Sequence, residues 1–107
     1  MKQTDLGAFL SAADRLPRAT TLFQESWLRG LLLHLNAGEQ IPEHQTRGAI
    51  TVHCLQGEAI FGSGEQQVTL RPASLISLAP ATPHRVIAQQ DTLLLVTVWE
   101  PIRDPSA

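Results

Sequence analysis

Two histidines, His44 and His84, are the residues of this sequence whose type and placement best suit chemistry. Each is carried by a loop to the start of a β-forming run: a glycine turn precedes His44, and a proline-rich loop precedes His84. Neutral imidazoles are good ligands for divalent transition metals such as Zn, Ni and Fe. If the two rings meet at one mouth of a closed fold, they can share a metal ion, or they can hydrogen-bond a small molecule, a water, a carbonyl or each other.

Short β-strands are the elements that must position these histidines. Successive runs rich in Val, Ile, Leu and Thr are bounded by Gly, Pro or small polar residues, with a turn signal roughly every eight to twelve residues, which is typical of an all-β sandwich or barrel. Strands do not alternate with helices, and this argues against a parallel α/β fold. The predicted strands occupy residues 20–26, 27–38, 49–55, 58–64, 66–72, 74–80, 83–89 and 91–99.

One short helical segment is predicted near the N-terminus, over residues 5–15. Leu6, Phe9 and Ala13 recur with the period of a helix, and Pro17 prevents its continuation. A chain of 107 residues is expected to form one domain.

The predicted domain has three parts. We expect an N-terminal arm over residues 1–19, a barrel over 20–100 and a polar tail over 101–107.

Composition excludes several classes of partner. The net charge is −2 and the arginines are scattered, whereas nucleic-acid binding requires clustered basic residues. No run approaches the roughly 20 apolar residues of a membrane span, and the N-terminus lacks the apolar run of a signal peptide. The single cysteine, Cys54, rules out an internal disulfide and suits a reducing compartment. We therefore expect a cytoplasmic protein, and the Ala-, Leu- and Arg-rich composition favours a bacterial one.

The spacing of these residues resembles the cupin family. The first cupin motif reads glycine, five residues, H-x-H, three or four residues, glutamate, six residues, glycine. Gly38, His44 and Gly57 stand at three of its positions. Residues 80–86, PATPHRV, resemble the second motif, with His84 at the ligand position. The resemblance implies a double-stranded β-helix, or jelly roll, with a pocket between two sheets.

The resemblance covers residues 28–99, and the sequence departs from the family pattern at three positions. Thr46 replaces the second histidine of H-x-H, Ile50 stands at the glutamate position, and Ala73 replaces the glycine that usually opens the second motif. Half of the implied metal-ligand set is missing. We therefore expect little oxygen activation, because an iron centre of that kind uses two histidines and a carboxylate.

The motif alignment also predicts the lining of the pocket. If Ile50 faces inward, strand alternation places Val52 and Cys54 on the same face and turns His53 outward. Apolar walls with a few polar groups are typical of small-molecule sites. The predicted ligand-binding pocket consists of His44, Thr46, Ile50, Val52, Cys54, His84 and Val86.

Other polar residues are weaker candidates. His53 would need a β-bulge to reach the metal position. Glu43 neighbours His44 and is a candidate carboxylate ligand, although a loop glutamate is more often solvated. Cys54 has no base near it in the sequence, so we interpret it as an inert core thiol. We interpret His34, within an apolar strand, as structural.

The leading hypothesis is a small cupin barrel that binds a small molecule, with His44 and His84 at the mouth of an apolar pocket and no strong catalysis. Two alternatives stay open. One is a metal-dependent cupin enzyme of dioxygenase or isomerase type, with His44 and His84 as its reduced ligand set. The other is a ligand-sensing module of a regulatory system.

A homodimer is also expected. A small barrel has edge strands that need covering, and the long apolar run at residues 31–35 precedes the half of the chain that carries the predicted pocket. The resemblance adds that small cupins commonly pair through their N-terminal strands.

Overall fold

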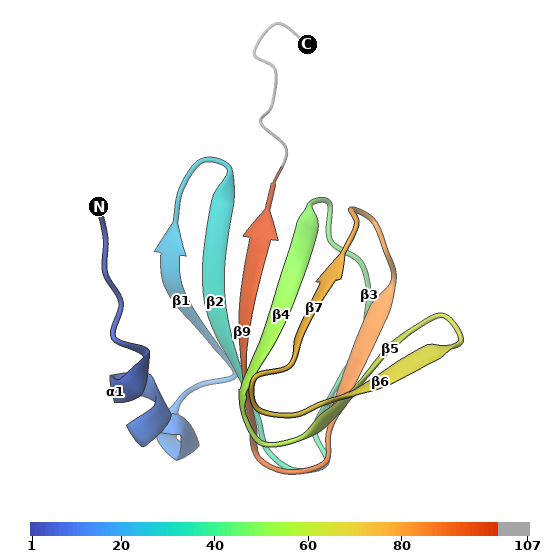
Figure 1. Cartoon of the computed structure of the whole chain (residues 1–107), viewed down its shortest axis with the longest axis horizontal. Coiled ribbons are helices and arrows are strands. Elements are labelled where there is room, and N and C mark those ends of the chain that lie inside the picture. Colours follow the sequence, from blue (N-terminus) through green and yellow to red (C-terminus); the bar gives the residue numbers. More distant parts are fainter. Residues whose placement is uncertain (101–107) are drawn as a thin grey trace, which may run out of the picture.

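The computed structural model describes residues 1–100, which form two antiparallel β-sheets preceded by a short helical segment. The five-stranded sheet has the order β1-β2-β9-β4-β7 and the four-stranded sheet the order β3-β8-β5-β6 (Figure 1). Strands β2 to β9 cross between the sheets in the order of a jelly roll, so the predicted all-β fold with a helical turn near the N-terminus is confirmed. The elements are α1 (Leu6–Ser11), a 3-10 helix (Ala13–Arg15), β1 (Ala19–Gln24), β2 (Leu28–Leu35), β3 (Gln40–His44), β4 (Ala49–Gln56), β5 (Ala59–Ser63), β6 (Gln66–Leu70), β7 (Leu75–Leu78), β8 (His84–Ala88) and β9 (Thr92–Trp99).

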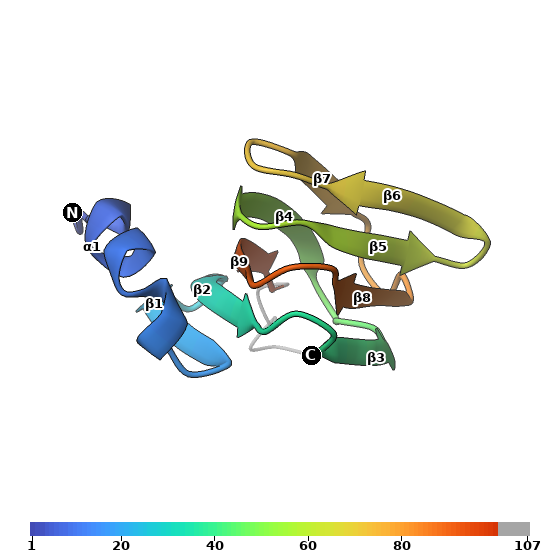
Figure 2. The ribbon, with the colours of Figure 1, turned by 90° about the horizontal axis from the view of Figure 1, so that it is seen from below.

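The two sheets face each other (Figure 2). Their inner faces bury apolar side chains between them. In β4 the alternation is regular, because Ile50, Val52 and Cys54 are buried while Thr51 and His53 between them are half-buried. This is the parity that the sequence predicted for this strand. The rest of the inner core comes from both sheets: Leu35, Ala59, Phe61, Leu70, Val86, Ala88, Leu94, Val96 and Val98.

The N-terminal segment covers the outer face of the five-stranded sheet beside β1 and β2 (Figure 2). The Asp5 side chain accepts a hydrogen bond from the Gly7 N–H and caps α1. The outward-facing Leu32 is buried beneath this segment, and the His34 Nδ1 lies 2.9 Å from the Leu16 carbonyl oxygen. The arm's apolar side chains pack around Leu22, Leu32 and Leu93, and they are Leu6, Phe9, Leu10, Ala13 and Leu16.

This cover explains why residues 31–35 are almost continuously apolar. Leu31 and Leu33 face the interior, while Leu32 and His34 face the arm, so both sides of β2 are buried within one chain. Strand β1 also pairs along the edge of β2. Both faces of β2 and one of its edges are therefore covered by other parts of the same chain.

Strand β3 was missed by the sequence analysis, which read this segment as a loop. Its sequence, QIPEH, is mostly polar, and Pro42 cannot donate to a β-ladder. The strand is possible because β3 is an edge of its sheet and pairs only with β8. Its importance is that it ends at His44.

Ala73, which stands where the family pattern has a glycine, adopts a backbone conformation that favours glycine. Ala73 has a φ of 76°, in the left-handed region. This conformation costs an L-residue about 1–2 kcal/mol. The turn holds it in place because the Ala73 N–H donates to the Cys54 carbonyl at 3.0 Å.

Within residues 1–100, no helix has the length and apolar character needed to cross a membrane. The tail predicted at residues 101–107 lies outside the described residues.

Candidate functional site

His44 and His84 lie next to each other where β3 ends and β8 begins. They are antiparallel partners in the register of these strands. Their ring centroids are 4.2 Å apart and the planes meet edge to face at 64°. The His84 ring also stacks on Phe61, with centroids 5.7 Å apart. His84 is only 5% exposed whereas His44 is exposed, so the pair leads from the surface into the interior.

Two backbone carbonyls fix the tautomer of both rings. The Nδ1 atom of His44 lies 3.0 Å from the Pro42 oxygen, and that of His84 lies 2.9 Å from the Thr82 oxygen. Because a carbonyl oxygen only accepts, Nδ1 must carry the hydrogen in each ring. In the neutral rings Nε2 then keeps a lone pair. The site therefore presents two acceptors, each able to bind an N–H or O–H donor or a metal ion.

The environment keeps His84 neutral. Burial lowers the pKa of His84 below its ordinary value, because desolvation penalises the charged imidazolium. The hydrogen bond to the Thr82 carbonyl opposes this change, and the neighbouring His44 adds to it. Near pH 7 the ring is an acceptor rather than a cation.

The two histidines border a cavity of about 320 Å³ between the sheets. This volume is at the lower end of the range of about 300–1,000 Å³ that is usual for small-molecule pockets. The Thr46 hydroxyl donates to the Gly48 carbonyl at 3.0 Å, which leaves an oxygen lone pair for a ligand. Six of the predicted pocket residues line the cavity: His44, Thr46, Ile50, Val52, His84 and Val86. The remaining walls are Arg29, Leu31, Leu33, Ile41, Phe61, Leu94, Val96 and Val98.

Cys54 is the predicted pocket residue that the structure places outside the lining. It shares the inward face of β4 with Val52 but lies in the closed part of the core, where it is fully buried. Its thiol donates to the carbonyl of Gln56 at 3.4 Å. Burial raises the pKa of the Cys54 thiol, so it stays protonated and is a poor nucleophile. Strand parity predicted its direction correctly, but parity does not say where a cavity ends.

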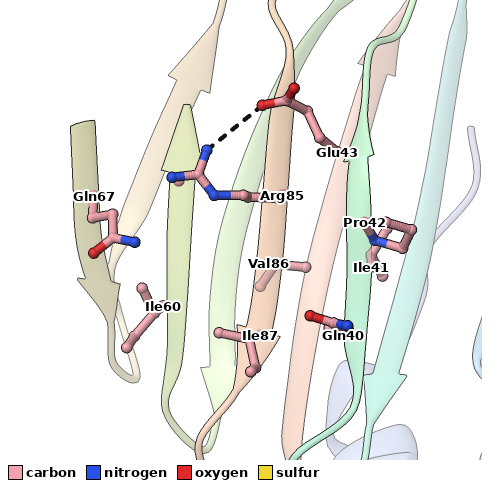
Figure 3. Close-up of a pocket in the computed structure, with 10 residues that line it drawn as sticks. Gln40, Ile41, Pro42, Glu43, Ile60, Gln67, Arg85, Val86 and Ile87 are labelled. Atoms are coloured by element: carbon pink, nitrogen blue, oxygen red, sulfur yellow. Dashed lines mark ion pairs between the residues drawn. The ribbon is translucent and has the colours of Figure 1, made fainter. Parts of the chain in front are cut away.

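Two other candidates also lie away from the histidine pair. His53 is on the outer face of β4, opposite Leu75 of β7, and does not line the cavity. Glu43 is turned toward Arg85, with 3.6 Å between Oε1 and Nη1 (Figure 3). Neither therefore adds a ligand to the histidine pair.

Arg29 is a cavity residue that the sequence analysis missed. It lies on β2 opposite Val98 of β9, in line with the inward-facing Leu31 and Leu33. Its Nε is buried and has no hydrogen-bond partner among residues 1–100. A buried donor without an acceptor costs about 1–3 kcal/mol, and more when the group is charged. The available signal was an arginine two residues before Leu31, because side chains on one face of a strand recur at every second position.

The donor atoms at this site do not fit a tight metal centre of the type that the resemblance implies. His44 and His84 offer two imidazoles and Thr46 a neutral oxygen, while Ile50 fills the carboxylate position. Catalytic zinc usually has three protein ligands, and non-haem iron adds a carboxylate to two histidines. Within the described part of the chain, no group of three or more His, Cys, Asp or Glu side chains could hold a metal ion.

A second hollow of about 310 Å³ lies on the outer face of the four-stranded sheet (Figure 3). Ile60 and Ile87 form part of its floor. Arg85 lies flat over Gly62, where a Cβ atom would come within 2.6 Å of its guanidinium carbon. The Nη2 of Arg85 donates to the Gly64 carbonyl at 3.1 Å, so the charged group of this outer groove is already hydrogen-bonded within the protein.

Comparisons with known proteins agree with this architecture. A family model described as Cupin domain matches residues 31–99. A cupin superfamily protein from Desulfitobacterium hafniense has a TM-score of 0.75 at 20% identity, covering 78% of this chain and 76% of that chain. KdgF from Halomonas sp. has a TM-score of 0.72 at 16% identity, with 83% and 82% covered. DMSP lyase DddQ from Ruegeria pomeroyi has a TM-score of 0.72 at 21% identity, with 80% of this chain and 48% of that chain covered.

No curated protein sequence matches the chain. The likeness to the solved structures shows the fold and does not transfer their activities, since one fold supports many functions. The family model itself covers well over half of the chain, and so the protein belongs to the cupin family.

Proposed function

We propose that this protein binds a small, largely apolar molecule between its sheets and holds it through His44, Thr46 and His84. The observation that carries the proposal is the pair of imidazoles whose Nδ1 hydrogens are bound to carbonyls at the edge of an apolar cavity. Each ring keeps Nε2 as an acceptor, and the walls favour an apolar body. The ligand is therefore a compact molecule with at least one O–H or N–H donor.

The residues that line the cavity favour ligand binding without strong catalysis. Activation by the metal centre of the family pattern needs further ligands. Thr46 and Ile50 stand where the family pattern supplies a histidine and a glutamate. The hydroxyl proton of Thr46 is already donated to Gly48, and Ile50 has no donor atom.

The binding proposal can be tested with neutral probes. We choose 4-hydroxybenzamide and a series of ω-hydroxy alkanamides of increasing length, each with a hydroxyl donor and an apolar body. Addition of these probes should shift the NMR signals of the His44 and His84 rings. Leu33→Trp, which places a bulky ring in the cavity, should abolish the shifts, and Ile60→Trp in the outer groove should not. Absence of binding by the whole series, or binding that survives Leu33→Trp, would refute the proposal.

A metal-dependent enzyme is the second candidate, because the two Nε2 atoms are also suited to a divalent cation. Its weakness is the incomplete donor set described above. Elemental analysis of protein purified without an affinity tag or chelator decides between the two. A stoichiometric transition metal favours the enzyme, and its absence favours plain binding.

We also propose a homodimer in a reducing cytoplasm. The buried free thiol of Cys54 is compatible with that compartment. Support for a dimer comes from apolar side chains that remain exposed, with Leu75 64%, Trp27 44% and Trp99 39% exposed. Light scattering that gives a monomer mass at micromolar concentration would rule out the dimer.

A further inference from the structure

The cavity contains one side chain with a permanent charge, Arg29. The other polar groups of its lining are the two imidazoles and the Thr46 hydroxyl, and no aspartate or glutamate from residues 1–100 lines it. Arg29 belongs to this space because its position on β2 pairs with Val98, whose side chain also lines the cavity. A cavity with a cation and no lining carboxylate has a potential that attracts anions.

The Arg29 guanidinium is not satisfied by the protein groups around it. Its Nε is buried and has no partner within the described chain. Among residues 1–100, Glu100 is the acid that approaches Arg29, but its Oε1 lies 3.8 Å from Nη2, beyond hydrogen-bond distance, and both side chains are about half exposed. Exposed pairs of this kind contribute little, so Glu100 does not account for a buried donor.

Arg85, in the outer groove, is an arginine whose guanidinium is hydrogen-bonded within the protein. Arg85 donates to the Gly64 carbonyl, packs over Gly62 and lies 3.6 Å from a Glu43 oxygen (Figure 3). Arg85 therefore has an acceptor and an acid within the protein. Among residues 1–100, Arg29 has only the 3.8 Å contact with Glu100, and its Nε lacks an acceptor there.

We propose that Arg29 recognises a carboxylate of the ligand, so that the cavity binds a small hydroxy- or amino-substituted monocarboxylic acid with an apolar body. Arg29 lines the cavity, and a carboxylate can accept from the N–H groups of a guanidinium with both oxygens. The apolar walls hold the body, and the imidazole acceptors take the hydroxyl or N–H donor. This inference rests on the proposed function, since it specifies the charge of the ligand in that cavity.

The test compares acids with their amides, which have nearly the same shape and no charge. The pairs are 4-hydroxybenzoate with 4-hydroxybenzamide, and ω-hydroxy alkanoates with the amides of the same lengths, measured by titration calorimetry near pH 7.5. The wild-type protein should bind the best acid at least about tenfold more tightly than its amide, because hydrogen bonds to charged groups are the stronger ones. Equal affinities, or a preference for the amide, would overturn the role of Arg29.

Variants assign the preference to one side chain. Arg29→Gln should weaken acid binding at least about tenfold and change amide binding less than about threefold. Arg29→Lys keeps the charge but loses the fork geometry and should keep only part of the preference. Arg85→Gln is the matched control and should bind both classes as the wild type does.

The outcomes separate this inference from the proposal on which it rests. Amide binding that shifts the His44 and His84 signals, with no preference for acids, keeps the proposed function and overturns the carboxylate. Failure of acids and amides alike overturns both. An acid preference that Arg29→Gln leaves intact also overturns the inference, because the charge is then recognised elsewhere.

Discussion

The cavity between the sheets and the groove on the outer face of the four-stranded sheet share strands β3 and β8, and Ile41 and Val86 line both hollows. Their volumes are nearly equal, about 320 and 310 Å³. His84 borders the cavity, and its neighbour Arg85 borders the groove. In the groove the charged groups face protein partners, whereas in the cavity two imidazole nitrogens and the Arg29 Nε keep hydrogen-bonding capacity.

The difference shows that hollow volume alone does not define a binding site. A group already bonded within the protein gains little from a ligand, because a new bond only replaces an old one. A buried group without a partner gains the whole bond.

The largest expected contrast is in stability. Phe61 is 5% exposed and stacks on His84, whereas Ile60 beside it on β5 faces the groove. Phe61→Ala should lower the free energy of unfolding by about 3 kcal/mol, the usual loss for a buried aromatic residue. Ile60→Ala should cost about 1 kcal/mol. Urea unfolding measures both, and equal losses would mean that the two faces of β5 are equally buried.

The next contrast concerns metal binding. Thr46→His combined with Ile50→Glu restores the ligand types of the family pattern beside His44 and His84. The affinity for Zn²⁺ should rise at least about a hundredfold, because metal affinity depends on a complete set of ligands. Titration calorimetry compares the double variant with the wild type.

Two controls locate that metal site. Ile60→Glu adds a carboxylate to the outer groove and should leave Zn²⁺ affinity unchanged. Tight binding by the wild type that is lost in His53→Ala would place the site on the opposite face of β4 and contradict the assignment of the cavity.

A smaller contrast is the response to pH. The folded-state pKa of His84 lies below the unfolded value of about 6.5, so the unfolded chain takes up the proton first as the pH falls. The stabilisation linked to neutral His84 is complete above about pH 6.5 and is lost as the pH falls through the folded pKa. Between about pH 7 and pH 5, wild-type stability should therefore decrease more than that of His84→Gln.

Urea midpoints across this pH range give the measurement, and Arg85→Gln is the control because its charge does not change there. Arg85→Gln should keep the wild-type slope. If His84→Gln also keeps it, the neutral state of His84 does not contribute to the pH dependence of stability.

The smallest effect is expected from the ion pair of the groove. Glu43 and Arg85 are separated by 3.6 Å and are both substantially exposed. Glu43→Gln should change the free energy of unfolding by less than about 0.5 kcal/mol. Thermal unfolding at low and high salt provides the check. A decrease of about 2 kcal/mol in the free energy of unfolding would show that this ion pair contributes substantially to stability.

Local patterns in the sequence predicted most of the strands and the inward face of β4. Alternation is a property of neighbouring residues, so Ile50, Val52 and Cys54 could be assigned to one face without a structure. Motif spacing identified His44 and His84, and the glycine position at Ala73 coincides with a left-handed backbone. Strand β3 was not predicted because Pro42 and its polar neighbours are typical of a loop. These residues form a strand through their pairing with β8.

By itself the sequence determined the succession of the strands other than β3, the direction of the β4 side chains and the two histidines, because these depend on residue type and local spacing. The tertiary structure alone decided that the rings meet at 4.2 Å with both Nδ1 hydrogens bound to carbonyls, and that the cavity ends before Cys54. It also decided that the Arg29 Nε is buried without a partner among residues 1–100. Enclosure and hydrogen-bond satisfaction depend on which distant strands come together, and the local pattern of a strand does not contain that information.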